Sequence, residues 1–145
     1  GSASQPPAQG APSVLPEGTP KERYTFAFHL LRQNRFDEAE EAWRAFLQAH
    51  GDNPLASNAR YWLGETYYVR GDFSSAAQLF LEGYERDPAG GKAPDTLLKL
   101  GMSLANLEKK REACAAFGKL KVDFPEASAA IQRTLIRESG RSGCK

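Results

Sequence analysis

Apolar positions of the chain repeat with a period of 37 residues between Phe26 and Phe117. In each unit a large apolar residue precedes a small one, a second small residue follows 12 positions later, and an aromatic residue comes four positions after that. A period of 20 to 50 residues is typical of repeat proteins. The three units contain Phe26-Ala27, Ala39 and Trp43, then Leu63-Gly64, Ala76 and Phe80, and then Leu100-Gly101, Ala113 and Phe117.

Each unit is predicted to form two helices, because its apolar residues are spaced three and four apart on either side of a short break. In the second unit the break is Gly71-Asp72. Gly71 can end the first helix, and the Asp72 carboxylate can cap the second. The paired helices are expected to cross closely at six small residues: Ala27, Ala39, Gly64, Ala76, Gly101 and Ala113.

The sequence therefore predicts an all-α fold, with three helix-turn-helix repeats at about 20–53, 57–90 and 94–127. Stacked helix pairs form a right-handed superhelix, and a terminal helix with one polar face covers the last apolar surface. We assign this capping role to residues 128–138, followed by a tail at 139–145. Its packing side would hold Ala129, Ala130, Ile131, Leu135 and Ile136, which would cover Phe117 and Leu120.

The first 19 residues are expected to be a disordered linker. Residues 1 to 20 hold five of the nine prolines, and Val14 and Leu15 are their large apolar side chains. Such a segment buries too little surface to offset the entropy lost on ordering. Gly1-Ser2 resembles the scar of a cleaved tag, and another segment is expected to precede the linker in the full protein.

Composition argues against several kinds of function. The 19 basic and 18 acidic residues give a net charge of +1, which disfavours nucleic-acid binding. No apolar run approaches the ~20 residues that span a bilayer, so no membrane insertion is expected. The two histidines and two cysteines lack metal-ligand spacing. His29 and His50 have no nearby Cys or Ser motif to activate, so we expect no enzyme, metal or cofactor.

The repeat pattern resembles the tetratricopeptide repeat, whose units carry Leu-Gly, Tyr, Gly-Asp-Tyr/Phe, Ala, Phe/Tyr and Pro in that order. The third unit has Leu104 in place of the tyrosine and Glu108 in place of the turn glycine. The usual period is 34, so three residues are added per unit, and we place them in the turns near 51–53 and 89–91. The second unit matches at Leu63, Gly64, Tyr67, Gly71, Phe73, Ala76, Phe80 and Pro88.

Residues 58–68 and 92–101 resemble the C-terminal domain of the YbgF/CpoB family of the Tol-Pal envelope system. The resemblance implies a periplasmic cell-division protein that binds the periplasmic domain of TolA and a bifunctional peptidoglycan synthase. It also implies a signal peptide and a trimerising coiled coil before the linker, so this fragment would be monomeric and the full-length protein trimeric. The alternative is a repeat scaffold of an outer-membrane assembly lipoprotein, and a weaker third is a hydrolase regulator.

The register of the family's repeats implies a concave face for partner binding. Aromatic side chains interleaved with polar groups suit a groove that grips a peptide or a helix. Packing between repeats is the alternative role for Phe28, Leu31 and Leu98. The expected face consists of Lys21, Tyr24, Phe28, Leu31, Asn58, Tyr61, Glu65, Tyr68, Asp95, Leu98, Met102 and Asn106.

The two cysteines allow two alternatives. Cys114 lies early in the second helix of the third repeat, and a capping helix antiparallel to that helix would end near its level. The tail could then bring Cys144 back to Cys114, and an oxidising periplasm would favour a disulfide. Otherwise Cys114 is a small buried apolar residue and Cys144 is a free thiol.

Overall fold

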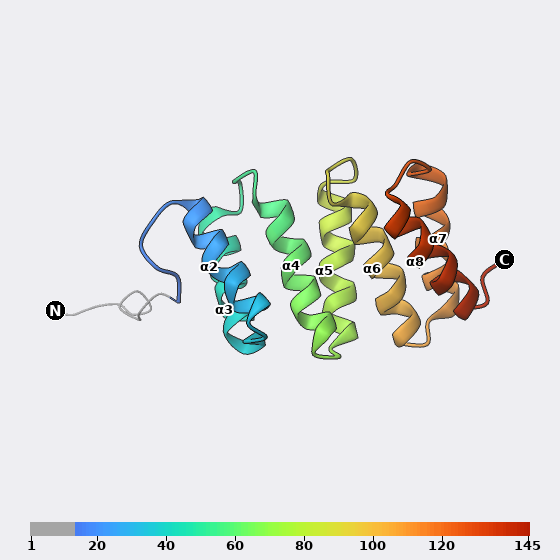
Figure 1. The fold of residues 1–145 in the computed structure, drawn as a ribbon, viewed down its shortest axis with the longest axis horizontal. Coiled ribbons are helices and arrows are strands. Elements are labelled where there is room, and N and C mark those ends of the chain that lie inside the picture. Colours follow the sequence, from blue (N-terminus) through green and yellow to red (C-terminus); the bar gives the residue numbers. More distant parts are fainter. Residues whose placement is uncertain (1–13) are drawn as a thin grey trace.

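The computed structural model describes residues 14–145, which form helices and no strand. Figure 1 shows the helices following one another in chain order along one row. Within the described part the seven helices are α2 (Pro20–Arg32), α3 (Phe36–His50), α4 (Ala56–Val69), α5 (Phe73–Arg86), α6 (Ala93–Asn106), α7 (Lys110–Asp123) and α8 (Ala129–Arg141).

One short turn joins the two helices of each repeat, at residues 33–35, 70–72 and 107–109. Their central residues are 37 positions apart and share a left-handed backbone, with φ of 61° at Asn34, 82° at Gly71 and 61° at Glu108. Glycine adopts this conformation most easily, and asparagine tolerates it. The turns between repeats, at 51–55 and 87–92, are longer, so the added residues lie where the sequence predicted them.

Glycine allows the two helices of the second and third repeats to cross closely. A Cβ atom at Gly64 would lie 2.6 Å from Cε1 of Phe80, and one at Gly101 would lie 2.3 Å from Cε1 of Phe117. Both phenylalanines are almost fully buried. The first repeat has Ala27 and Trp43 at the corresponding positions, and both are completely buried. In the second and third repeats the aromatic residue therefore packs against the glycine of its partner helix.

The stack is curved, with α2, α4 and α6 on the inner side. The Cα traces of α2 and α4 approach within 8 Å, as do those of α4 and α6, whereas α3, α5 and α7 do not approach one another this closely. Neighbouring helices lie closer together on the concave side of a superhelix. The first helix of each repeat therefore lines the concave face, as expected for stacked tetratricopeptide-type repeats.

The predicted linker ends earlier than residue 19. The Leu15 side chain is 6% exposed and belongs to the core of the first repeats. Nε of Arg23 donates a hydrogen bond to the Pro16 carbonyl at 2.9 Å, and Thr19 caps α2 together with Glu22. This one apolar side chain anchors residues 14–19, a contribution that the composition did not reveal. The predicted tag scar and the predicted linker up to residue 13 lie outside the described residues.

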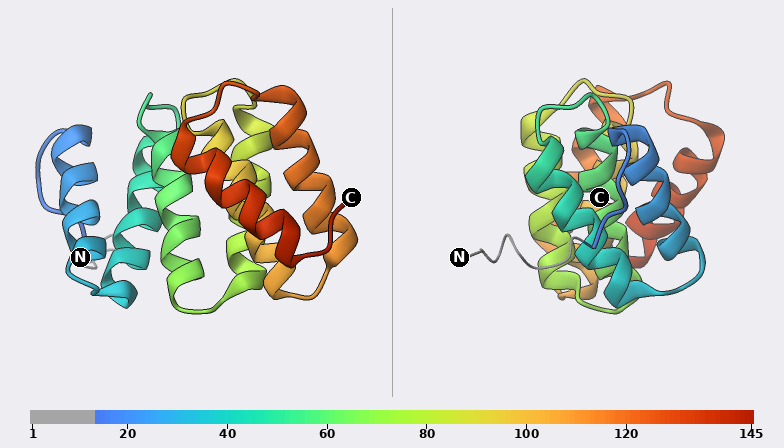
Figure 2. Two further views of the ribbon diagram at one scale, coloured as in Figure 1. Left: turned by 45° about the vertical axis from the view of Figure 1, so that its right-hand side comes forward. Right: turned by 90° about the vertical axis from the view of Figure 1, so that its left-hand side faces the viewer.

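Helix α8 differs from the predicted cap. It extends to Arg141 rather than 138, and none of its residues is buried. Ile131 and Leu135 pack partly against the core of the third repeat, but Ile136 is 74% exposed. Figure 2 shows α8 running obliquely to the other helices instead of joining the parallel row. Because α8 lies over α6 as well as α7, it covers the last repeat incompletely.

A disulfide bond joins Cys114 near the start of α7 to Cys144 in the tail, with a Cα–Cα distance of 5.4 Å. Of the two alternatives that the sequence left open, the structure therefore has the bridged one. The bond fixes the end of α8 beside α7. At its other end, Ser128 caps α8 by accepting a hydrogen bond from the backbone N–H of Ile131.

Candidate functional site

Aromatic rings from α2 and α4 meet on the inner face. The Trp62 indole donates a hydrogen bond from Nε1 to the Tyr24 hydroxyl at 2.9 Å. The Trp62 ring meets the edge of Phe28 with centroids 5.0 Å apart, and Phe28 stacks with Tyr24 at 6.5 Å. All three rings are half-buried, so each keeps part of its surface open to solvent. Rigid rings of this kind offer a large contact area at low entropic cost.

Cationic side chains lie over these rings. The Lys92 ammonium is 4.8 Å from the ring centroids of both Tyr61 and Trp62, and the Lys99 ammonium is 4.5 Å from the centroid of Tyr68. Lys99 also forms an ion pair with Glu65 at 3.1 Å. Cations over aromatic faces at partly desolvated sites stabilise the arrangement and fix the ring positions. The inner face is thus a preformed surface of rings and positive charges.

Three of the twelve residues predicted to bind a partner are buried. Leu31 and Tyr61 are each 9% exposed and Leu98 is 7% exposed. The packing role considered for Leu31 and Leu98 therefore fits their burial, whereas Phe28 remains half-buried on the face. The other nine keep exposed or half-buried side chains: Lys21, Tyr24, Phe28, Asn58, Glu65, Tyr68, Asp95, Met102 and Asn106.

Helix α8 covers the part of this face that the third repeat contributes. A cavity of about 300 Å³ lies between the two, lined on the repeat side by Tyr61, Asp95, Leu98, Lys99 and Met102. Its other wall is α8, through Ala130, Ile131, Thr134 and Arg137. From the sequence, this helix was expected at the end of the stack. Its actual position leaves α2, α4 and the end of α6 as the open portion of the inner face.

Sequence reasoning missed Trp62, Lys92 and Lys99. Trp62 and Lys99 are 37 residues apart, so they occupy the same repeat position, one place after the predicted Tyr61 and Leu98. The repeat register therefore indicated that Trp62 and Lys99 are equivalent, but the family pattern assigns the concave face to the preceding positions, Tyr61 and Leu98. Lys92 precedes α6 in a loop, and only the folded geometry places it over Tyr61 and Trp62.

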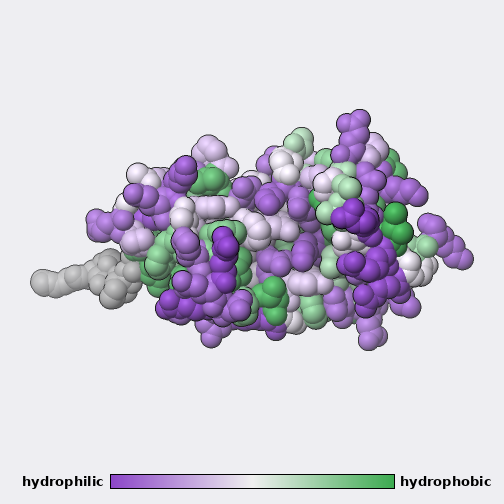
Figure 3. Space-filling model, viewed as in Figure 1, coloured by the Kyte–Doolittle hydropathy of each residue, from purple (hydrophilic) through white to green (hydrophobic). Residues whose placement is uncertain are grey.

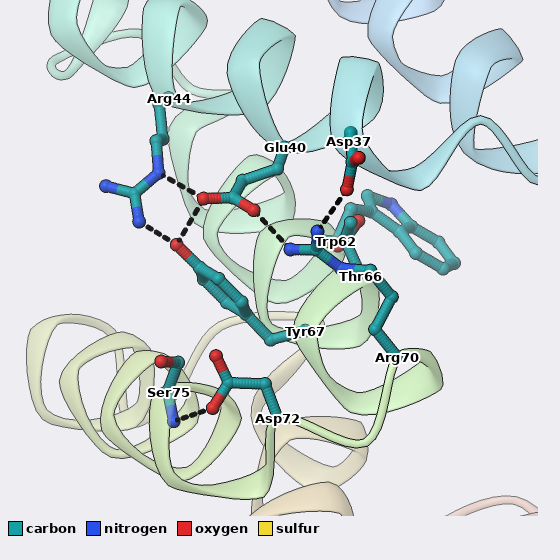
Figure 4. A network of polar contacts seen from close by, with 9 residues as sticks. All are labelled: Asp37, Glu40, Arg44, Trp62, Thr66, Tyr67, Arg70, Asp72 and Ser75. Carbon is teal, nitrogen blue, oxygen red and sulfur yellow. Dashed lines mark hydrogen bonds and ion pairs between the residues drawn. The ribbon is translucent and has the colours of Figure 1, made fainter.

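A separate polar network joins α3 to α4 (Figure 4). The Glu40 carboxylate accepts hydrogen bonds from Arg44 Nε and from the Tyr67 hydroxyl, both at 3.0 Å, and pairs with Arg70. Arg70 also pairs with Asp37 at 2.5 Å. Hydrogen bonding to Glu40 holds the pKa of Arg70 above its usual value. Because these groups satisfy one another between repeats, the network fixes the relative position of the first two repeats.

Tyrosines on the inner face have raised pKa values. Burial raises the pKa of Tyr61 far above its ordinary value of 10.0, and the carboxylates of Glu65 and Asp95 raise it further. Burial is also the main cause of the raised pKa of Tyr68, with Glu138 of α8 contributing. The folded state therefore favours the neutral form of these side chains.

We expect stability to fall above about pH 10 because of these tyrosines. Between the ordinary pKa of 10.0 and the raised pKa, the folded chain holds the Tyr61 proton while the unfolded chain releases it. The free energy of unfolding thus decreases as pH rises through this window and is unaffected by Tyr61 below it. Melting temperatures measured from about pH 9 to pH 11 should fall less steeply in Tyr61→Phe. Identical slopes for the two proteins would contradict the assignment.

The described residues offer neither a metal site nor a membrane-spanning helix. No group of three or more His, Cys, Asp or Glu side chains lies close enough to hold a metal ion. No helix between residues 14 and 145 is both long and apolar enough to span a membrane.

Comparisons with known proteins agree with the repeat geometry. Models of the tetratricopeptide repeat match residues 24–91 and 95–127. The cell division coordinator CpoB of Pseudomonas putida, including strain KT2440, is 42% identical over 64 residues. That match covers 43% of this chain and 24% of the relative, so the chain spans about a quarter of the length of these relatives.

Solved structures share the fold at lower sequence identity. A mutant of MamA superposes with a TM-score of 0.68 at 18% identity, covering 94% of this chain and 70% of its own. MamA AMB-1 gives a TM-score of 0.63 at 19% identity, covering 86% and 69%. These likenesses bear on the fold alone. The family models, the helix pairs and the relatives together show that this chain belongs to the tetratricopeptide repeat family, with a domain similar to that of CpoB.

Proposed function

We propose that the chain is a protein-binding module of the Tol-Pal envelope system. In this proposal it acts in the periplasm, where it binds the periplasmic domain of TolA. Through TolA and a bifunctional peptidoglycan synthase, it coordinates outer-membrane constriction with cell-wall synthesis during division. The similarity to CpoB supports this assignment. Tetratricopeptide repeats build extended concave surfaces for partners, which supports a binding role rather than a catalytic one.

The observation that carries the proposal is the half-buried aromatic surface on the open part of the inner face. Phe28, Trp62 and Tyr68 come from two neighbouring repeats and keep solvent-accessible ring surface. Contacts with Tyr24, Lys99 and Phe73 hold the three rings in place. A partner segment that lies across α2 and α4 would therefore meet a rigid surface and lose little affinity to ordering of these side chains.

Alanine substitutions on this face should weaken TolA binding. Phe28→Ala and Tyr68→Ala each remove a ring that a bound segment would cover, and such aromatic residues often dominate binding energy. We expect each variant to reduce the affinity for the TolA periplasmic domain by roughly tenfold or more, measured by isothermal titration calorimetry.

Leu81→Ala is the matched control, because Leu81 is a 45% exposed apolar residue on α5, outside the inner layer. It should leave the affinity unchanged. Circular dichroism of each variant verifies the fold. If folded Phe28→Ala and Tyr68→Ala bind TolA as the unchanged protein does, the inner face is not the TolA site.

A further inference from the structure

An apolar groove lies between α7 and α8, apart from the inner face. Its volume is about 640 Å³, within the range of sites that hold a ligand or several side chains of a partner. Figure 3 shows apolar groups in green at the α7–α8 end of the molecule, among purple polar side chains. The walls are formed mainly by Phe117, Phe124, Leu135, Ile136 and the Cys114–Cys144 disulfide, with Gly118 and Gly140 between them.

The groove occupies the position where the first helix of a following repeat would pack. Cys114 and Gly118 lie two periods after Glu40 and Arg44 of the first repeat. There, Tyr67 of α4 covers both residues by contacting them directly. The helix that follows the third repeat, α8, lies over both α6 and α7, and it leaves part of the corresponding surface of α7 open. The open surface is therefore shaped to pack against a helix.

Two glycines of the groove have no role in packing within the chain. Beyond its chain neighbours and the backbone of its own helix, a Cβ atom at Gly118 or Gly140 would meet no atom within 4 Å, in contrast to Gly64 and Gly101. Glycine weakens a helix interior relative to alanine. A bound helix could approach the backbone closely at both positions, which would account for small residues there.

Charge defines the kind of helix that fits. Residues 110–145 carry eight basic and four acidic side chains, whereas residues 1–109 carry eleven basic and fourteen acidic ones. Lys121 and Lys145 line the groove, and no Asp or Glu side chain does. Two of the nearby carboxylates are neutralised within the chain, since Asp123 pairs with Lys119 at 2.8 Å and Glu138 lies near Arg137 and Arg141.

We propose that the α7–α8 groove binds an amphipathic helix of a partner protein, and that this helix carries acidic residues beside its apolar face. The bound helix takes the place of the first helix of a fourth repeat. A second copy of this chain fits less well, because its first helix, α2, has three basic residues and one acidic residue. Like charges would then face Lys121 and Lys145. The inference does not depend on which partner the inner face binds.

A pair of model peptides tests the groove. Each is about 18 residues long, roughly five helical turns, with leucine on one face and either glutamate or lysine on the other. We expect the glutamate peptide to bind more tightly than the lysine peptide by fluorescence anisotropy. In ¹H–¹⁵N correlation spectra, it should shift the amide signals of Gly118 and Gly140 more than those of Phe28 and Tyr68.

Gly118→Leu places a side chain in the groove, because a Cβ atom at this position meets open space and leucine favours a helix. It should reduce glutamate-peptide affinity at least tenfold while the melting temperature stays the same or rises. Ala115→Leu is the matched control, since it adds a leucine to an exposed position of α7 that does not line the groove. Lys121→Glu should reverse the preference between the two peptides.

Four results of the peptide experiments would overturn the proposal. These are no binding of either peptide, equal binding of both, signal shifts confined to the inner face, or unchanged binding by Gly118→Leu. A concentration-dependent dimer that Gly118→Leu abolishes in sedimentation equilibrium would assign the groove to a second copy instead. None of these outcomes bears on TolA binding at the inner face, so the two proposals fail or succeed separately.

Discussion

Replacing Trp43 with alanine is expected to lower the free energy of unfolding by about 3–5 kcal/mol. The Trp43 side chain is fully buried between the helices of the first repeat, with its ring 5.1 Å from that of Tyr24. Its removal leaves a large cavity, and Ala27 and Ala39, which are buried in the same core, are too small to fill it. Domains of this size are stable by only about 5–15 kcal/mol. Urea denaturation followed by circular dichroism at 222 nm would measure the change.

Trp43→Phe is the informative control. The indole Nε1 of Trp43 is buried with no hydrogen-bond partner among the described residues, and an unpaired buried donor costs about 1–3 kcal/mol. Phenylalanine removes this donor and still fills most of the space, as Phe80 and Phe117 do at the same position of the later repeats. We therefore expect Trp43→Phe to cost much less than Trp43→Ala. Equal losses in the two variants would contradict this account of the first repeat.

The repeat fold could be predicted from sequence because its determinants are local and recur. The 37-residue period located the helix pairs, and the small residues at 27, 64 and 101 marked the crossings. Each crossing requires a small residue opposite an aromatic one, and both residues can be recognised in the sequence by their type and spacing. The burial of Leu15 could not be predicted in this way, because a single apolar residue among prolines gives no periodic pattern.

The candidate site was less predictable because it depends on how separate helices meet. The apolar residues of α8 indicated that it packs on the third repeat, but not which side of that repeat it covers. Its position decides that Tyr61 and Leu98 are covered and that the α7 surface near Gly118 is open. Likewise, Lys92 reaches the inner face only because the loop before α6 folds over α4.

The position of α8 also makes the disulfide the main bond between this helix and the rest of the fold. No residue of α8 is buried, so apolar packing holds the helix only weakly. The bond between Cys114 and Cys144 closes a loop across a sequence separation of 30 that contains most of α7 and all of α8. Stacked repeats contact only their neighbours, so loss of the disulfide should destabilise mainly the α7–α8 end.

Replacement of both cysteines by alanine is accordingly expected to lower the stability of the α7–α8 end by about 3–4 kcal/mol, the chain-entropy value for a loop of this length. In hydrogen exchange followed by mass spectrometry, amides of α8 should lose protection first and those of α7 next. Amides of α2 to α5 should change little, because they pack around Trp43 and Phe80, far along the stack from the bond.

A reducing agent provides the matching experiment, since it should produce the same exchange pattern in the unchanged protein and no further effect in the double alanine variant. Uniform loss of protection along all helices would mean that the repeats unfold as one unit. Unchanged protection of α8 after reduction would mean that Ile131 and Leu135, which pack partly against the third repeat, hold the helix without the bond. The covalent link is decisive only if α8 leaves the repeats when the link is cut, which is the result that its sparse packing leads us to expect.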